Sequence, residues 1–394
     1  MSRALWMAVC VFTGACAGLE PAAPGDDELL DGPVEGLTSA QNARHLAGDI
    51  AFNDDVFTPD RGLGPLFVAT SCGSCHPGDG RGHPFTTLTR FGQTDETGNR
   101  FLSSGGPQLQ HRAIPGYLPE SIPAGAAAAR FLPPGNTGLG FLELVPDDSL
   151  LALADPDDAD GDGISGVPNW IVPPSFLPLP PGTVVRNGRV IGRFGRKASV
   201  HTLFQQTVNA YNQDIGIASA FDPVDTHSLQ EVDPEISTAT IGDVVFYLQT
   251  LKVPPRRDAA NPSVLSGERI FSGINCSGCH TPRLRTGPSP VVPLSGAEIA
   301  PYSDLLLHDM GSGLDDGYTE GSARTSEWRT PPLWGLGLAR NSQGGATFLL
   351  HDGRARSIEE AILLHGGEAA PVVDRYRRLT QAEQQYLIRF LESL

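Results

Sequence analysis

The sequence predicts a mainly helical, loop-rich protein built from two similar units, the first of which carries a large insertion. Two stretches of sixteen residues, 236–251 and 379–394, align without a gap and share apolar residues at helical spacing. Each stretch closes a segment that contains one Cys-x-x-Cys-His motif. The 46 glycines and 34 prolines among 394 residues exceed the usual roughly 7% and 5%, which indicates much irregular backbone.

The two sixteen-residue stretches are predicted to be amphipathic helices with Ser237 and Thr380 as N-caps. Apolar residues recur in them at matching positions: Val244/Leu387, Tyr247/Phe390, Leu248/Leu391 and Leu251/Leu394. A Gly-x-x-x-Phe pattern precedes each cysteine motif, at 48–52 and at 267–271. A glycine at this place allows a helix to cross another closely, so we expect a crossed helix pair in each unit.

The repeat also sets the expected domain boundaries. The first unit is predicted over residues 37–251 and the second over 262–394, with a Pro- and Arg-containing linker at 252–261. The first unit is much the longer, so most of residues 77–235 is expected to be an insertion. Ahead of it, residues 18–36 form an acidic stretch rich in Pro and Gly that suits a tether.

Residues 1–17 resemble an export signal, because a short apolar run follows Arg3 and small residues follow the run. Ala15-Cys16-Ala17 fits a signal-peptidase site, whereas the segment ending at Cys16 resembles a lipoprotein box with Cys16 as the lipidated residue. Both interpretations predict an exported protein, periplasmic or anchored in the outer membrane as a lipoprotein. The only expected membrane contact is through that lipid anchor.

The four cysteines beyond Cys16 form two identical motifs, Cys72-Gly-Ser-Cys75-His76 and Cys276-Ser-Gly-Cys279-His280. This spacing places two thiols where they can form thioethers with haem vinyl groups, and it places a histidine next to the iron. A zinc site would need paired motifs close in sequence, and a thioredoxin-like dithiol would need a βαβ context that is missing. The sequence therefore predicts two covalently attached haem c groups in two class I cytochrome c-like domains.

The second ligands of the two irons are less defined. The only methionines are Met1, Met7 and Met310, so Met310 is the single candidate once the signal is removed, with His351 as its alternative. His308 and His365 compete for the same role in the second unit. In the first unit the candidate second ligands are His83, His111, His201 and His227. Because the first unit contains no methionine, its haem is expected to be bis-His, ligated by another group or five-coordinate.

Two further patterns bear on the site. Asp158, Asp160 and Asp162 alternate ahead of a glycine, as in a Ca²⁺ loop, although an acidic solvated turn would look similar. Glu143 lies in an apolar run, where burial perturbs a carboxyl pKa, and is the candidate acid–base residue for peroxide chemistry. Gln108 is a candidate for orienting the peroxide.

With these motifs, the chain resembles the di-haem oxidoreductases related to bacterial di-haem cytochrome c peroxidases, a family also described as thiol-oxidoreductase-like. The segments that carry the resemblance are 71–82, 153–169, 192–198, 302–311, 328–337 and 350–369. The resemblance implies a peroxidatic haem in the first domain, an electron-accepting His/Met haem in the second, Ca²⁺ between the domains and a distal Glu. The chain departs from its relatives at Arg196, where they often carry Trp, and at Leu350, near the axial Met of the peroxidases.

Three functions remain open from the sequence. The first is reduction of peroxide or another small oxidant at the first haem, with electrons entering through the second. The second is a non-catalytic di-haem electron carrier, and the third is oxygen activation or oxidation of a separate substrate at an open haem. The formal net charge of −17 disfavours nucleic acid as a partner. It favours a small cationic electron donor such as a basic cytochrome c.

Overall fold

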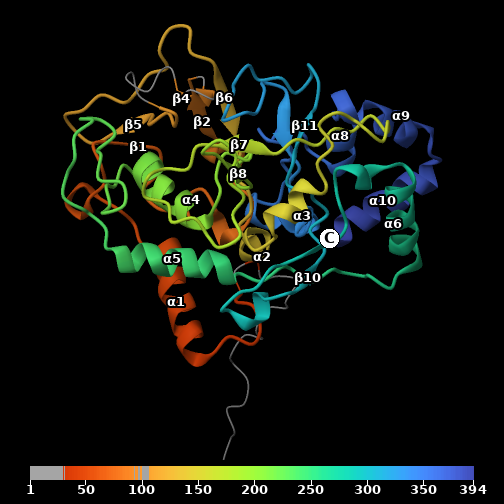
Figure 1. Ribbon diagram of the computed structural model, residues 1–394, viewed down its shortest axis with the longest axis horizontal. Coiled ribbons are helices and arrows are strands. Elements are labelled where there is room, and N and C mark those ends of the chain that lie inside the picture. Colours follow the sequence, from red (N-terminus) through yellow and green to blue (C-terminus); the bar gives the residue numbers. More distant parts are fainter. Residues whose placement is uncertain (1–29, 31, 93, 96–97, 100–105) are drawn as a thin grey trace, which may run out of the picture.

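Helices and loops dominate the architecture, as predicted, and the strands form only short antiparallel pairs. The computed structural model describes residues 30, 32–92, 94–95, 98–99 and 106–394 (Figure 1). The helices are α1 (Ser39–Asn53), α2 (Leu139–Glu143), α3 (Asp147–Leu151), α4 (Leu203–Ala210), α5 (Thr238–Thr250), α6 (Pro262–Gly273), α7 (Ala339–Ser342), α8 (Ile358–Leu363), α9 (Ala370–Arg378) and α10 (Gln381–Ser393). The predicted export signal, Cys16 and most of the tether lie outside the described residues.

The strands pair two by two and form no larger sheet in the part of the chain that is described. The pairs are β1 (Leu66–Phe67) with β5 (Arg112–Ala113), β2 (Leu88–Phe91) with β6 (Ala128–Phe131), β3 (Thr94–Asp95) with β4 (Gly98–Asn99), β7 (Asn169–Ile171) with β8 (Val190–Gly192), β9 (Leu284–Arg285) with β10 (Glu298–Ile299), and β11 (Leu307–Asp309) with β12 (Glu327–Arg329). In Figure 1 most of the labelled strands lie above α5.

Two crossed helix pairs, α1 with α5 and α6 with α10, frame the molecule at opposite sides of Figure 1. The predicted N-caps are confirmed: Ser237 accepts a hydrogen bond from the Thr240 amide, and Thr380 accepts one from the Glu383 amide. Each pair buries the aromatic residues of the repeat, Phe52 with Tyr247 and Phe271 with Phe390. The repeated pattern in the sequence therefore corresponds to a repeated packing unit.

Glycine is required at both crossings. A Cβ atom at Gly48 would overlap the carbonyl oxygen of Asp243, and one at Gly267 would overlap that of Tyr386. The backbones of the paired helices are thus in direct contact. The second cysteine motif follows α6 directly, whereas the first is separated from α1 by a 3-10 turn and strand β1 and is bonded back to the end of α1 through the Gly73 amide. None of the described helices is both long and apolar enough to span a lipid bilayer.

Substitution of Gly267 should show how much the crossing contributes. Gly267→Ala forces α6 away from α10, and we expect it to lower the free energy of unfolding by about 3 kcal/mol, as for overpacked cores. Gly273→Ala is the matched control, because it lies in the same helix and its Cβ would meet no atom within 4 Å. Thermal unfolding of both variants measures the difference. Equal unfolding midpoints would show that the crossing is not tightly packed.

Candidate functional site

The first cysteine motif opens into a cavity formed by the described residues. The loop carrying Cys72, Cys75 and His76 is fixed to the end of α1 by a 3.3 Å hydrogen bond from the Gly73 amide to the Phe52 carbonyl. All three residues line a cavity of about 500 Å³. This cavity, called the first cavity below, is bounded by residues from the insertion as well as from α1 and α5.

The ring of His76 is held in one orientation. Its Nδ1 donates a hydrogen bond of 2.9 Å to the carbonyl oxygen of Pro134. Burial lowers the pKa of His76 to about 4, so the imidazole is neutral near pH 7. With Nδ1 as the donor, Nε2 is left as a metal-binding atom, the arrangement seen in most histidine ligands.

The second motif repeats this arrangement around a smaller cavity of about 200 Å³, called the second cavity below. Cys276, Cys279 and His280 line it. His280 Nδ1 donates to the carbonyl oxygen of Tyr302 at 2.9 Å, and burial lowers the pKa of His280 to about 4. Both histidines therefore present a neutral Nε2, which is what coordination of an iron requires.

The thiols do not have the character of a redox dithiol. Burial raises the pKa of Cys72, Cys75 and Cys276 to about 12 and also raises that of Cys279, so all four are protonated near pH 7. Reactive dithiols have lowered pKa values instead. The four thiols are free of disulfides, and the only cluster of metal-ligating side chains found among the described residues contains no cysteine.

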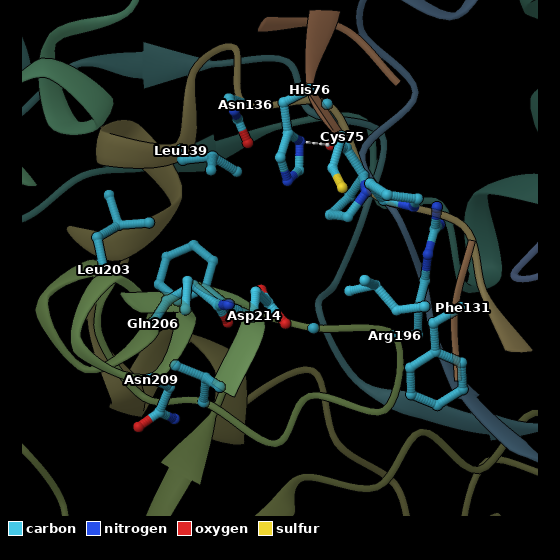
Figure 2. Close-up of a pocket in the computed structure, with 18 of the residues that line it drawn as sticks. Cys75, His76, Phe131, Asn136, Leu139, Arg196, Leu203, Gln206, Asn209 and Asp214 are labelled. Atoms are coloured by element: carbon cyan, nitrogen blue, oxygen red, sulfur yellow. Dashed lines mark hydrogen bonds between the residues drawn. The ribbon is translucent and has the colours of Figure 1, made fainter. Parts of the chain in front are cut away.

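A carboxyl group faces His76 across the first cavity. It belongs to Asp214, which lies in a π-helical turn (Tyr211–Ile215) that extends α4. Figure 2 shows Cys75 and His76 on one side of the open space and Asp214 and Gln206 on the other. Burial raises the pKa of Asp214 to about 7, and the positive charge of Arg90 opposes part of that shift. Single π-turns of this kind are frequent at functional sites.

None of the described residues offers a second histidine or a methionine to the first cavity. His83 accepts a hydrogen bond from the Phe85 amide, His201 donates to the Ile191 carbonyl, His227 packs on Tyr117, and His111 is exposed. The side of the cavity opposite His76 is lined instead by carboxyl, amide and phenol groups. Tyr211 and Gln108 each line it and each have a buried oxygen without a hydrogen-bond partner.

The two residues expected to act on peroxide have different positions. Gln108 lines the first cavity, with its Nε2 3.4 Å from the Thr89 carbonyl. Glu143 is half-buried and does not line the cavity: its carboxylate accepts hydrogen bonds from the Leu203 amide at 2.7 Å and from Gln249 Nε2 at 2.6 Å. The apolar run around Glu143 predicted burial, and burial does raise its pKa, but the carboxylate is used to cap α4.

The second cavity brings together all four candidate ligands of the second unit, Met310, His308, His351 and His365. His308 is bonded at both ring nitrogens, to Asp304 at 2.8 Å and to Glu368 at 3.0 Å, and these bonds raise its pKa to about 12. A doubly donating imidazolium has no lone pair for a metal. His308 is thereby removed from the set of candidates.

The acidic loop gathers three carboxylates, although not the three that were expected. Asp155, Asp158 and Asp160 have oxygens within 4.8 Å of one another. Asp162 turns away, accepting hydrogen bonds from the Ile164 amide and from Asn275 Nδ2. The alternation of acidic residues identified the loop, but the turn at Gly161, which has a φ of +74°, decides which side chains converge.

Three arginines, Arg81, Arg196 and Arg329, line both cavities and so lie between them. Burial lowers their pKa values to about 10, 9 and 10, and none of them forms an ion pair with a described carboxylate. Their hydrogen bonds go to backbone carbonyls, such as those from Arg196 Nε and Nη2 to Leu132. Buried positive charges without anions are costly, and the carboxylates of two haems would offset them.

The residues present therefore fit two haems at three points. Each cavity holds a pair of thiols and a histidine Nε2, and the wall between the cavities supplies positive charge for the haem carboxylates. Asp214 and the arginine cluster were not found from the sequence. No spacing pattern marks them, because they come from separate loops that meet only in the fold.

The family model described as "Di-haem oxidoreductase, putative peroxidase" matches residues 129–394. Because this match covers more than half of the chain, the protein belongs to that family, and membership implies two haem groups. The matched range includes the second motif, Asp214 and Arg196, whereas the first motif precedes it. The resemblance noted from the sequence motifs is confirmed.

Similar solved structures include hydrazine synthase of Kuenenia stuttgartiensis, with 15% identity, a TM-score of 0.40 and coverage of 100% of both chains. A MauG-like protein associated with microbial copper homeostasis has 14% identity and a TM-score of 0.41, covering 93% of this chain and 92% of that one. The diheme peroxidase BthA of Burkholderia thailandensis has 14% identity and a TM-score of 0.41, covering 92% and 87%. No curated protein matches the sequence.

The arginine cluster can be tested through the haem potentials. Arg196→Gln removes a positive charge that lines both cavities, which should make reduction of both haems less favourable. At an effective dielectric constant of about 20, a unit charge about 8 Å away is worth about 2 kcal/mol. Spectroelectrochemical titration should show both midpoint potentials falling, with a smaller effect for Arg196→Lys. Arg130→Gln, at an exposed position, is the control, and a shift of one haem alone would contradict the shared role.

Proposed function

We propose that the protein is an exported di-haem c-type oxidoreductase that reduces peroxide, or another small oxidant, at the haem of the first cavity. Electrons enter through the haem of the second cavity. The observation that carries this proposal is the side of the first cavity opposite His76. It offers a carboxyl group with a pKa of about 7 and no histidine or methionine from the described residues.

Reduction of hydrogen peroxide to two waters takes up two electrons and two protons. The haem, when bound, supplies the site where the peroxide is held and the path by which electrons reach it. The protein must move a proton from one peroxide oxygen to the other. Asp214 suits this task because a carboxyl with a pKa near the working pH can both accept and return a proton.

The surroundings of Asp214 support this role. Arg90 is the nearest positive charge that acts on its pKa, but the guanidinium is already paired with Glu320 at 2.7 Å. Asp214 is therefore left with a pKa near 7 instead of being held permanently ionised. Gln108 and Tyr211, which line the same cavity and have unpaired oxygens, are placed to orient the small oxidant.

Covalent attachment and the domain fold belong to the same proposal. In each half of the chain the two cysteines lie beside the histidine on a loop that lies against the end of a crossing helix. We infer that each crossed pair is the framework of a class I cytochrome c-like domain, with thioethers at Cys72, Cys75, Cys276 and Cys279. The long segment between the first motif and α5 is then the insertion that builds the oxidant site.

The electron donor, the location and the calcium site complete the proposal. An excess of 45 acidic over 28 basic residues supports a small cationic donor, such as a basic cytochrome c. The apolar run and Cys16 near the N-terminus support export to the periplasm or lipid anchoring at the outer membrane. The three converging carboxylates of the acidic loop support Ca²⁺ binding.

Replacement of Asp214 tests the proposed chemistry. Asp214→Asn keeps the shape but cannot accept a proton, so kcat/KM for hydrogen peroxide should fall by about 100-fold or more. In the wild type, kcat/KM should rise with pH through about 7, because only the carboxylate accepts the proton, and this dependence should vanish in the variant. Stopped-flow measurements with the reduced holoprotein give both quantities. Glu143→Gln should change stability and leave the pH profile in place.

The same preparation distinguishes an enzyme from a carrier. An enzyme should show one ferric haem that binds cyanide rapidly, with peroxide turnover that depends on Asp214. Two low-spin haems at every potential, together with no turnover of peroxide, would make the protein an electron carrier and overturn the proposal.

Removal of calcium should weaken the acidic loop. Dialysis against EDTA is expected to lower the unfolding temperature of the holoprotein, and Ca²⁺ should restore it, because a bound ion stabilises the state that binds it. Asp160→Asn should reduce this response, while Asp374→Asn, on the exposed part of α9, should leave it intact. Identical melting curves with EDTA and with Ca²⁺ would show that the loop is only an acidic turn.

A further inference from the structure

His365 is the one candidate ligand in the second cavity whose ring is held in the same manner as the motif histidines. Its Nδ1 donates to the carbonyl oxygen of Ala361 at 2.6 Å. His76 and His280 also direct Nδ1 to a backbone carbonyl. In all three, Nε2 is therefore the atom left for a metal.

Two structural anchors fix the position of His365. On one side it follows α8, whose first turn is capped by Ser357 through a 3.0 Å bond from the Glu360 amide. On the other side, Glu368 is tied to Ser165 Oγ at 2.6 Å and to the Asp309 amide at 3.2 Å. The intervening Gly367 has a φ of +53°, and a Cβ there would overlap the Asp309 carbonyl. The turn is therefore in direct backbone contact with β11.

The competing groups are engaged elsewhere. His308 is bonded to carboxylates at both ring nitrogens. His351 lies flat on Trp328, with ring centroids 3.6 Å apart and an interplanar angle of 8°. Met310 packs against a cluster of apolar side chains that includes Leu314 and Trp328.

We propose that Nε2 of His365 is the second axial ligand of the haem in the second cavity, opposite His280. This inference rests on the proposed function, since it requires a haem in that cavity. Bis-histidine ligation closes the second iron to small molecules, whereas the first cavity keeps an open side facing Asp214. Met310 then acts as packing between the haem and β12 and is not a ligand.

The test is magnetic circular dichroism and EPR of the ferric holoprotein at neutral pH. The wild type should show one bis-histidine haem and lack the far-red charge-transfer band of His/Met ligation. His365→Ala should convert that haem from low spin to high spin, and added imidazole should restore the low-spin spectrum. Met310→Leu, the matched control in the same cavity, should leave the spectrum unchanged.

Two results would overturn the proposal: a His/Met band that is lost in Met310→Leu, or a bis-histidine spectrum that survives in His365→Ala. If His365→Ala does not fold, the wild-type spectrum and His365→Met decide, because the latter should introduce the His/Met band. A pyridine haemochrome assay of the wild type separates failure of the His365 assignment from failure of the proposed function. Two bound haems with a different ligand would overturn only the His365 assignment, whereas absence of covalent haem would overturn both.

Discussion

The direct backbone contact between crossed helices is the constraint on which the rest of the structure depends. At Gly48 and Gly267 the absent Cβ lets α1 meet α5 and lets α6 meet α10. The second cysteine motif follows its crossing directly, and the first returns to the end of α1, where the Gly73 amide bonds to the Phe52 carbonyl, so each crossing fixes where the histidine of its motif lies. A carbonyl from a distant loop, Pro134 or Tyr302, then fixes how its ring is turned. Helix packing and one hydrogen bond together place each Nε2.

The wall between the cavities is electrostatically incomplete without anionic ligands. Arg81, Arg196 and Arg329 approach one another there, and burial and mutual repulsion lower the pKa of Arg196. Such a cluster would be expected to destabilise a protein that contained nothing but its own chain. Two haems with their carboxylates remove this cost, and the same guanidinium groups then influence both irons. The same residues thus bear on both cofactor sites, because all three arginines line both cavities.

The two cavities differ in the side that faces away from the motif histidine. The first presents Asp214 from a π-helical turn, with amide and phenol groups around it. The second presents His365, held between the end of α8 and the anchored Glu368. Equal frameworks therefore support unequal chemistry, because the insertion in the first half and the α8 segment in the second half contribute different side chains. Under the proposed function, the first cavity is the one that takes the small oxidant and the second is the one that passes electrons.

The sequence by itself determined the features that local spacing encodes. The Cys-x-x-Cys-His motifs, the caps at Ser237 and Thr380 and the two Gly-x-x-x-Phe patterns each depend on residues close together in the chain. The tertiary structure alone decided which side chains meet across a cavity. Glu143 was singled out for its apolar run, but it is half-buried and its carboxylate caps α4, while Asp214 occupies the position opposite His76. In the acidic loop, Asp155 converges with Asp158 and Asp160, while Asp162 accepts a hydrogen bond from the distant Asn275. Such meetings depend on loops tens to hundreds of residues apart, and no periodicity records their contact.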